Sequence, residues 1–445
     1  MTAVSDKDGR WLAAASAVGD ELCATALVHG ELCTWIGRSL EEADPVTFAI
    51  APVAESLGTD LYGGTAGIAL FLAQLAALGG RARHSEIARS AIRHALRRPL
   101  PQGGHPLGFY SGTLGIAYAA AQTGALLQDE AIRGAGVALA LKVLRELDPE
   151  LKGPQPIDII GGCAGAILAL LALPAADGGK GGAELREGAL RLGRYLCQRA
   201  EKQPGGQWLW YEDSSAGEEP TPDGQRPWPM TGYSHGAAGI TLALAELYAL
   251  SREPLFREAA LGGITYEDRW FSAAEGNWPD LRTSAAQTGA PAAGDGMIYG
   301  VSWCHGAPGI ALSRLRELTL LPDDRALLLR DIDAGLGTTN KGLIERQKQG
   351  RGDATPCHGS TGLAEALLVG GQALGVAEYT AAALATGQAL LDDRKQHGAW
   401  LSGCPTGGPN PSLLLGSAGV GYFFLRLHDP ARVPSILLPP HALPV

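Results

Sequence analysis

The chain has 445 residues, of which 46% are apolar, and a formal net charge of −10. The negative charge argues against a nucleic acid held through its phosphates, and seven scattered cysteines, an odd number, argue against a secreted disulfide framework. The N-terminus has no signal-peptide pattern, and the longest apolar stretch, residues 164–176, is too short to span a bilayer. We therefore expect a cytoplasmic protein that neither binds nucleic acid nor inserts into a membrane.

Seven Gly-x-x-Gly frames recur along the chain. Their first glycines are 48 to 57 residues apart, except for two longer steps of 74 and 70 residues. Each frame opens a strongly apolar run, and the segments between frames alternate charged residues with Ala and Leu at helical spacing. The frames are Gly64/Gly67, Gly112/Gly115, Gly162/Gly165, Gly236/Gly239, Gly306/Gly309, Gly359/Gly362 and Gly416/Gly419.

This repeat predicts an all-α fold with two layers of helices. An apolar helix followed by an amphipathic one, seven times over, gives seven inner and seven outer helices. We expect them to close into an α/α-toroid over a single domain of residues 1–445, with glycine allowing close approach of the inner helix ends. An open helical solenoid shares the same periodicity. Closure is favoured because residues suited to bind a metal lie on separate repeats and must converge.

The two longer steps contain irregular sequence at residues 203–231 and 273–298. Long loops in compact folds are usually functional or disordered. Both segments lead into frames that carry histidine or cysteine, so we expect them to act as lids at the mouth of a site.

Histidine directly precedes the first glycine in the fourth, fifth and sixth frames, as His235, His305 and His358. Cys304 and Cys357 precede the last two of these histidines. Thiolates and imidazoles are ligands that zinc prefers, and superposed frames would bring these side chains together. Two arrangements stay open at this point. Two Cys and two His make a closed structural zinc site, whereas three protein ligands leave a position for substrate and make a catalytic one.

The motifs also resemble a known family. Ser-Trp-Cys-His-Gly-Ala-Pro-Gly-Ile at 302–310, Cys-His-Gly at 357–359, Asp-Ile-Ile-Gly-Gly at 158–162 and Asn-Trp-Pro-Asp-Leu-Arg at 277–282 are similar to lanthipeptide cyclases. The greatest similarity is to the C-terminal cyclase domain of class II lanthipeptide synthetases. It runs from about residue 11 to the C-terminus and includes all seven frames.

The resemblance implies a site and a role for each residue in it. One zinc ion is bound by Cys304, Cys357 and His358 with its fourth position open, while His305 and Trp303 lie beside the ligands. His235 and Asp158 match the catalytic histidine and acidic residue of the family, although an aspartate such as Asp158, read alone before an apolar helix, is more often a helix cap. An arginine that some members carry shortly before the Trp-Cys pair has no counterpart at residues 297–302.

The same resemblance implies a zinc-dependent cyclase. Peptide cysteine thiols add to dehydroalanine or dehydrobutyrine in the same ribosomal precursor peptide, forming lanthionine or methyllanthionine thioether rings. Because the chain starts where the cyclase domain would, we expect either that a separate dehydratase supplies the dehydrated precursor or that the chain is a fragment of a larger synthetase. Two alternatives remain: an enzyme that adds an external thiol such as glutathione, and a non-catalytic peptide-binding subunit of a modifying complex.

Overall fold

The computed structural model describes residues 9–44, 49–100, 104–173, 180–212, 228–282, 296–350, 352–400 and 409–438. In these ranges one apolar helix begins at each of the seven frames. These inner helices are α2 (Thr65–Ala77), α4 (Thr113–Leu126), α6 (Cys163–Ala172), α8 (Ala237–Ser251), α11 (Ala307–Leu320), α13 (Ser360–Leu374) and α15 (Ser417–His428).

An outer helix packs on each inner helix. Six of the outer helices follow their inner partner in the chain, whereas α1, near the start of the chain, packs on α15, near its end. They are α1 (Arg10–Thr25), α3 (Ala82–Arg97), α5 (Glu130–Glu146), α7 (Lys180–Arg199), α9 (Pro254–Trp270), α12 (Arg325–Gln349) and α14 (Ala377–His397), with a short 3-10 turn η1 (Pro322–Asp324) before α12.

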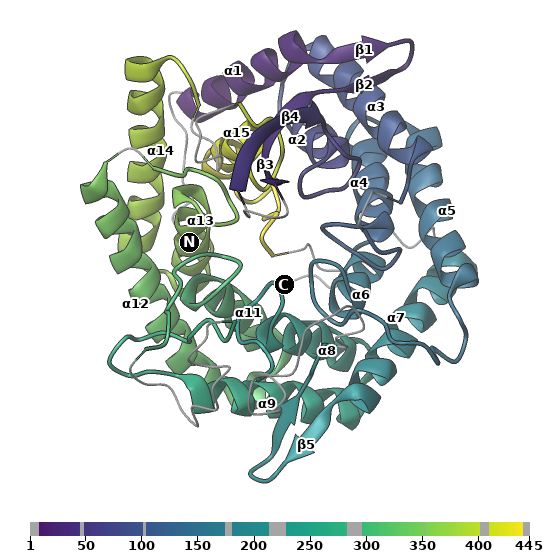
Figure 1. Cartoon of the computed structure of the whole chain (residues 1–445), viewed down its shortest axis with the longest axis vertical. Coiled ribbons are helices and arrows are strands. Elements are labelled where there is room, and N and C mark those ends of the chain that lie inside the picture. Colours follow the sequence, from purple (N-terminus) through teal and green to yellow (C-terminus); the bar gives the residue numbers. More distant parts are fainter. Residues whose placement is uncertain are drawn as a thin grey trace.

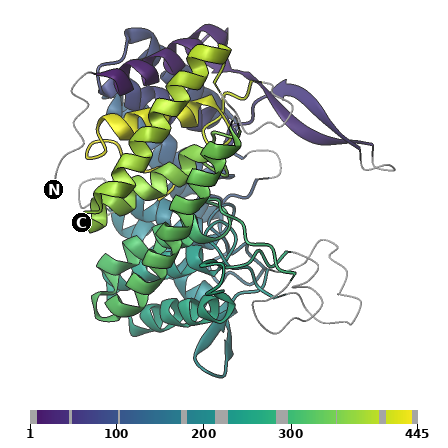
Figure 2. The ribbon, with the colours of Figure 1, turned by 90° about the vertical axis from the view of Figure 1, so that its left-hand side faces the viewer.

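The inner helices form a closed ring (Figure 1). Each contacts the next one along the chain, and α15 contacts α2 to complete the circle. The predicted α/α-toroid is therefore confirmed, and the open solenoid is excluded. Figure 1 shows the outer helices surrounding the inner ones, and Figure 2 shows the toroid from the side.

Burial explains the two kinds of helix. In α6 every residue from Cys163 to Leu171 is buried, because the helix is surrounded by its neighbours and by an outer helix. In α3 the buried apolar residues, such as Ile87, Ala91 and Ala95, recur every three or four positions and form one face. None of the described helices combines the length and the hydropathy needed to cross a membrane.

The second glycine of each frame is required by a close backbone contact within its own loop. A Cβ at Gly309 would lie 2.1 Å from the carbonyl oxygen of Trp303, and one at Gly362 would lie 2.0 Å from that of Pro356. Real side chains do not approach this closely, so only glycine fits. This contact holds the loop against the start of the following helix. It thereby fixes the position of the residues just before the first glycine.

Backbone hydrogen bonds link these loops around the toroid. The residue two positions before the first glycine of one frame donates its N–H to the matching residue of a neighbouring frame. These links run from Cys357 to Leu414, from Leu414 to Tyr62, from Tyr62 to Tyr110 and from Tyr110 to Ile160, over 2.9 to 3.1 Å, and then, shifted by one residue, from Ile159 to Ser234 and on from Ser234 to Cys304. We call this array the backbone ring. It places both cysteines on the same circle of loops.

Three antiparallel hairpins accompany the helices and were not expected from the sequence. The longest, β3 (Ile36–Asp44) with β4 (Ala49–Ser56), projects from the toroid on the side where the loops before the inner helices gather (Figure 2). The two shorter hairpins pair β1 (Leu27–His29) with β2 (Leu32–Thr34), and β5 (Glu201–Gln203) with β6 (Gln207–Leu209).

The segments predicted as lids are only partly described. Residues 213–227 and 283–295 lie outside the described residues. The beginning of the first segment forms the β5–β6 hairpin, in which Trp208 and Trp210 are buried and the Trp210 indole donates to the carbonyl of Leu196 over 2.8 Å. In the second segment, Asp280 donates its N–H to the carbonyl of Ile298.

A buried charge network supports the fourth frame. Arg314 on α11 is fully buried and forms ion pairs with Glu267, Glu317 and Asp331 over 2.5, 2.9 and 3.2 Å. Glu267 in turn accepts hydrogen bonds from the N–H groups of Gly232 and Ala238. The network thus holds the loop that contains His235.

Replacing Arg314 with methionine is expected to lower the free energy of unfolding by about 3–5 kcal/mol, because buried carboxylates lose their counter-charge. Burial already raises the pKa of Glu267 to about 7, so its ionised form depends on Arg314. Urea unfolding of Arg314→Met measures the loss. Arg257→Met, which breaks a partly exposed pair with Asp324, is the matched control and should cost about 1 kcal/mol or less. Equal losses for the two variants would contradict this account.

Candidate functional site

Two of the predicted metal ligands, Cys304 and Cys357, meet at the loop end of the toroid. Their thiols are hydrogen-bonded to each other. The Tyr62 hydroxyl donates to the Cys357 sulfur over 2.8 Å, and the Ser302 hydroxyl lies 3.3 Å from the Cys304 sulfur. Cys357 is buried, whereas Cys304 is partly accessible. The ring therefore brings two residues 53 positions apart in sequence into one thiol pair.

The pKa values of the two thiols are shifted in opposite directions. The hydrogen bond from Cys357, aided by Ser302 and by the nearby His358, lowers the pKa of Cys304 to about 6 even though burial opposes ionisation. The pKa of Cys357 is raised, because it donates to Cys304 and is buried. Cys304 is therefore the thiol that ionises first, and a thiolate is the form that binds metals.

His358 lies beside this pair and is oriented by a carboxylate. Its Nδ1 is hydrogen-bonded to Asp353, which also accepts the N–H of Thr355 over 2.7 Å. The Asp353 hydrogen bond outweighs burial and raises the pKa of His358. With Nδ1 occupied, Nε2 is the nitrogen left for a ligand, and a carboxylate behind the imidazole is the usual arrangement around a metal-binding histidine.

His235 and Asp158 form a second pair in the neighbouring frames. His235 Nδ1 lies 2.5 Å from the Asp158 carboxylate, whose other oxygen accepts the N–H of Gly161 over 2.7 Å. Ser234, next to His235, donates both its N–H and its hydroxyl to the carbonyl of Cys304. The histidine–aspartate pair is thereby tied to the loop of the thiol pair.

Asp158 controls the charge of His235. Burial lowers the pKa of His235, but the hydrogen bond and the negative charge of Asp158 outweigh burial and leave the pKa above its usual 6.5. A raised pKa means that protonated His235 stabilises the fold at pH values below about 6.5, and that this contribution is lost as the pH rises through the pKa in the folded protein.

Replacing Asp158 with asparagine is expected to move the pKa of His235 below 6.5, since burial then acts without the compensating charge. NMR titration of the histidine ring protons measures the shift. His105, whose pKa burial lowers in the absence of a carboxylate partner, should titrate identically in both proteins and serves as the internal control. An unchanged His235 titration would contradict the role assigned to Asp158.

The side chains of His305 and Trp303, on either side of Cys304 in the sequence, make different contacts. The His305 ring stacks on His235 with centroids 6.1 Å apart, and burial together with the charge of Arg282 lowers the pKa of His305 to about 4. His305 is therefore neutral near pH 7. Trp303 is fully buried, and its indole donates to the carbonyl of Leu437 over 2.9 Å. Its side chain thus points into the core, toward the C-terminal segment.

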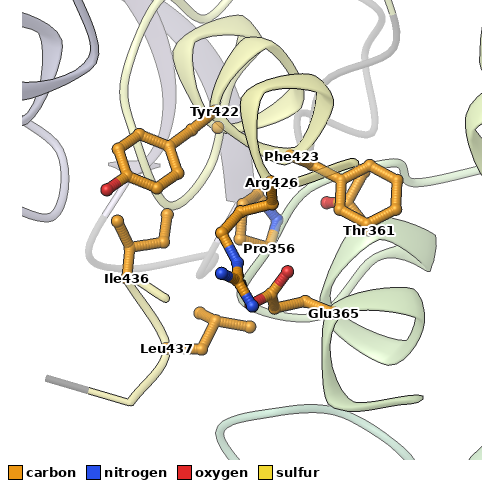
Figure 3. Close-up of a pocket in the computed structure, with 9 residues that line it drawn as sticks. Pro356, Thr361, Glu365, Tyr422, Phe423, Arg426, Ile436 and Leu437 are labelled. Atoms are coloured by element: carbon orange, nitrogen blue, oxygen red, sulfur yellow. Dashed lines mark hydrogen bonds and ion pairs between the residues drawn. The ribbon is translucent and has the colours of Figure 1, made fainter. Parts of the chain in front are cut away.

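That C-terminal segment lies close to the residue before Cys357 (Figure 3). Ile436 and Leu437 line a small hollow together with Pro356, the residue before Cys357. Arg426 fastens the segment: it pairs with Glu365 over 2.8 Å and donates to the carbonyl of Val433. The start of the Cys357 loop therefore lies next to a segment that Arg426 holds in place.

His235 also belongs to a second group of side chains that could bind a metal ion. Asp158, Glu212 and His235 have donor atoms that all lie within 4.8 Å of one another, and no other three His, Cys, Asp or Glu side chains of the described residues meet that spacing. Cys304, Cys357 and His358 are thus neighbours without closed ligand geometry. The 2.5 Å hydrogen bond between His235 and Asp158 is also a geometry that can transfer a proton, so this cluster could either hold a metal ion or exchange protons.

Three residues of the site were missed in the sequence. Tyr62 occupies the same position in the first frame as the cysteines do in theirs, so the repeat held the signal. Asp353 is five residues before His358, but nothing in the sequence shows that its carboxylate turns toward the ring. Glu212 stands in a long irregular segment, where spacing carries no structural information.

Comparison with known proteins relates this arrangement to a family. Residues 55–438 match the family described as lanthionine synthetase C-like protein. Among solved structures, nisin cyclase is similar with a TM-score of 0.65 and 17% identity over 96% of each chain, which shows a shared fold. A second structure, described with the sugar chain dGlcA-Glc-Rha-Glc, covers 76% of this chain and 84% of that chain at 16% identity and a TM-score of 0.44, too low to carry an argument.

Proposed function

Because the chain belongs to the lanthionine synthetase C-like family, we propose that it is a zinc-dependent cyclase that forms thioether rings in a ribosomal precursor peptide. Its substrate is a peptide carrying cysteine and dehydroalanine or dehydrobutyrine. The observation that carries the proposal is the placement of the Cys304–Cys357 thiol pair, with His358 beside it, next to the His235–Asp158 pair. A metal-binding group and a proton-transfer group share one end of the ring.

The residues present fit one zinc ion. Cys304, Cys357 and His358 supply two sulfurs and one nitrogen, which is a donor set that zinc favours, and the lowered pKa of Cys304 prepares a thiolate for it. Three protein ligands leave one position open, as catalytic zinc sites do. When bound, zinc supplies the acidity that turns a substrate thiol into a thiolate at neutral pH.

The remaining chemistry is proton transfer. The substrate sulfur forms a bond to the β-carbon of the dehydro residue, the electron pair of the double bond moves toward the α-carbon, and a proton is added there. The proton lost by the thiol and the proton gained by the α-carbon balance. Asp158 holds His235 by Nδ1, so Nε2 is the nitrogen that faces substrate and exchanges these protons. Neutral His305 beside it adds no competing charge.

The proposed partners follow from this chemistry. Thiol addition needs a dehydrated residue, so a separate dehydratase supplies the precursor peptide, and thiols stay reduced in the cytoplasm, where we place the protein. The alternative use of the same site is the addition of an external thiol such as glutathione, for which the bond-forming step is identical. A non-catalytic peptide-binding subunit is disfavoured, since such a subunit needs no proton-transfer pair beside its thiols.

The test uses zinc-loaded protein and a purified precursor peptide that carries cysteines and dehydroalanines. Ring closure leaves the mass unchanged, so free thiols are alkylated and counted by mass spectrometry. The proposal predicts loss of alkylatable thiols that depends on the protein and is unaffected by glutathione. Adducts of glutathione with intact peptide thiols would instead support the external-thiol alternative, and no reaction at all would leave the non-catalytic one.

A further inference from the structure

The backbone ring is interrupted at the place where the site lies. Going round the toroid, each frame loop is hydrogen-bonded through its backbone to the next, from Cys357 by way of Leu414 and Tyr62 as far as Cys304. Between the Cys304 loop and the Cys357 loop, no backbone hydrogen bond is made among the described residues. The two loops that carry the thiols are therefore neighbours without this mutual link.

Besides the hydrogen bond between the two thiols, the side chain of Arg346 spans this break. Arg346, near the end of α12, donates from Nη1 to the carbonyl of His358 over 2.6 Å and from Nη2 to the carbonyl of Val301 over 3.0 Å. Val301 belongs to the loop of Cys304, and His358 follows Cys357. A single guanidinium thus ties the two loops together, using its planar fork to reach both carbonyls at once.

The charge of Arg346 also suits this place. Its guanidinium is partly buried and lies close enough to interact with Asp353 and with Cys304. Asp353 orients His358 through the imidazole Nδ1. The guanidinium charge therefore attracts the carboxylate that orients one of the proposed ligands. Sequence patterns do not single out Arg346, because it lies on an outer helix among several other charged residues.

We propose that Arg346 is a positioning residue for the metal: by joining the Cys304 loop to the Cys357–His358 loop across the break in the backbone ring, it sets the separation of the three ligands. The proposal rests on the proposed zinc site and extends it to a residue that touches neither metal nor substrate. Because Arg346 acts through two backbone carbonyls, its loss should change the geometry of the three ligands.

The experiment compares Arg346→Gln and Arg346→Lys with wild type, using zinc(II) in competition with a chromophoric chelator and cobalt(II) absorption as a report on coordination geometry. Arg346→Gln is expected to lower zinc affinity about 10–100-fold, the usual effect of losing a partner behind the ligands, and to change the cobalt bands. Arg346→Lys keeps the charge but reaches one carbonyl only, so its zinc affinity should lie between those of wild type and Arg346→Gln. Lys348→Gln, on the exposed side of the same helix, is the matched control and should equal wild type.

Hydrogen exchange of the metal-free proteins gives a readout independent of zinc. Both Arg346 variants should exchange faster at residues 300–306 and 353–359 than wild type does. Zinc affinity and cobalt spectra equal to wild type in Arg346→Gln would overturn the proposal, as would a lowered melting temperature with unchanged cobalt bands, which a merely structural role predicts. If Arg346→Gln does not fold, the lysine variant decides by the same criteria. A wild-type protein that binds no zinc would contradict the proposed function instead, and the exchange rates would still test whether Arg346 joins the loops.

Discussion

Replacing His235 with alanine is expected to slow ring closure by about 100- to 10,000-fold, the range typical for loss of a general acid or base, while the zinc content stays at the wild-type level. His235 is held by Asp158 at Nδ1 and is tied to the Cys304 loop through Ser234, yet it is not among the proposed ligands. Its removal therefore affects proton transfer and leaves the thiols in place. The rate is measured by alkylation and thiol counting over time, alongside metal analysis of the same preparation.

A neighbouring histidine provides the control for this variant. His305 stacks on His235 but is neutral near pH 7, so His305→Asn should cause a much smaller loss of rate. The pH profile adds a second check, because the activity of wild type should decline above the raised pKa of His235 if the protonated form is the acid. Unaltered cyclisation by His235→Ala would end its assignment as a catalytic residue.

Replacing Cys357 with alanine is expected to remove the metal and, with it, all measurable cyclisation. The change deletes one of three proposed ligands and also the hydrogen bond that lowers the pKa of Cys304, so the remaining thiol becomes a poorer ligand. Zinc affinity should fall by more than about 100-fold, beyond the effect of losing a residue behind the ligands. Metal analysis after dialysis against a weak chelator gives the readout.

Cys197 offers the matched control for the cysteine variant. It is a buried free cysteine on the outer helix α7, remote in the chain from the metal motifs, and Cys197→Ala should keep full zinc and full activity. Full zinc retention by Cys357→Ala would contradict the proposed ligand set and direct attention to the cluster of Asp158, Glu212 and His235.

The fold and the neighbourhood of the thiols could be predicted because the repeat imposes them. A glycine such as Gly309 must admit a carbonyl of its own loop, so the requirement recurs in every frame and is visible in the sequence. Cys304 and Cys357 occupy the same position in adjacent frames, and a ring of frames has to place them side by side. A structural feature that every repeat requires can therefore be predicted from the repeated sequence pattern.

The remaining features depend on side-chain directions and local loops that no repeat encodes. Asp353 reaches His358 because of a turn in one loop, and Arg346 spans two loops from an outer helix that carries several other charged residues. The β3–β4 hairpin precedes the first inner helix and has no equivalent in the other repeats. The direction of the Trp303 indole, which donates to the carbonyl of Leu437, likewise cannot be predicted from the repeat.

The proposed function requires that a substrate thiol reaches an open metal position formed by Cys304, Cys357 and His358. X-ray absorption at the zinc edge can test this step by counting sulfur neighbours before and after addition of a cysteine-containing precursor peptide. We expect two sulfurs in the free protein and three with the peptide, and two in both states when the peptide thiols are alkylated beforehand. A count that the peptide leaves unchanged, or a metal surrounded by nitrogen and oxygen alone, would contradict it.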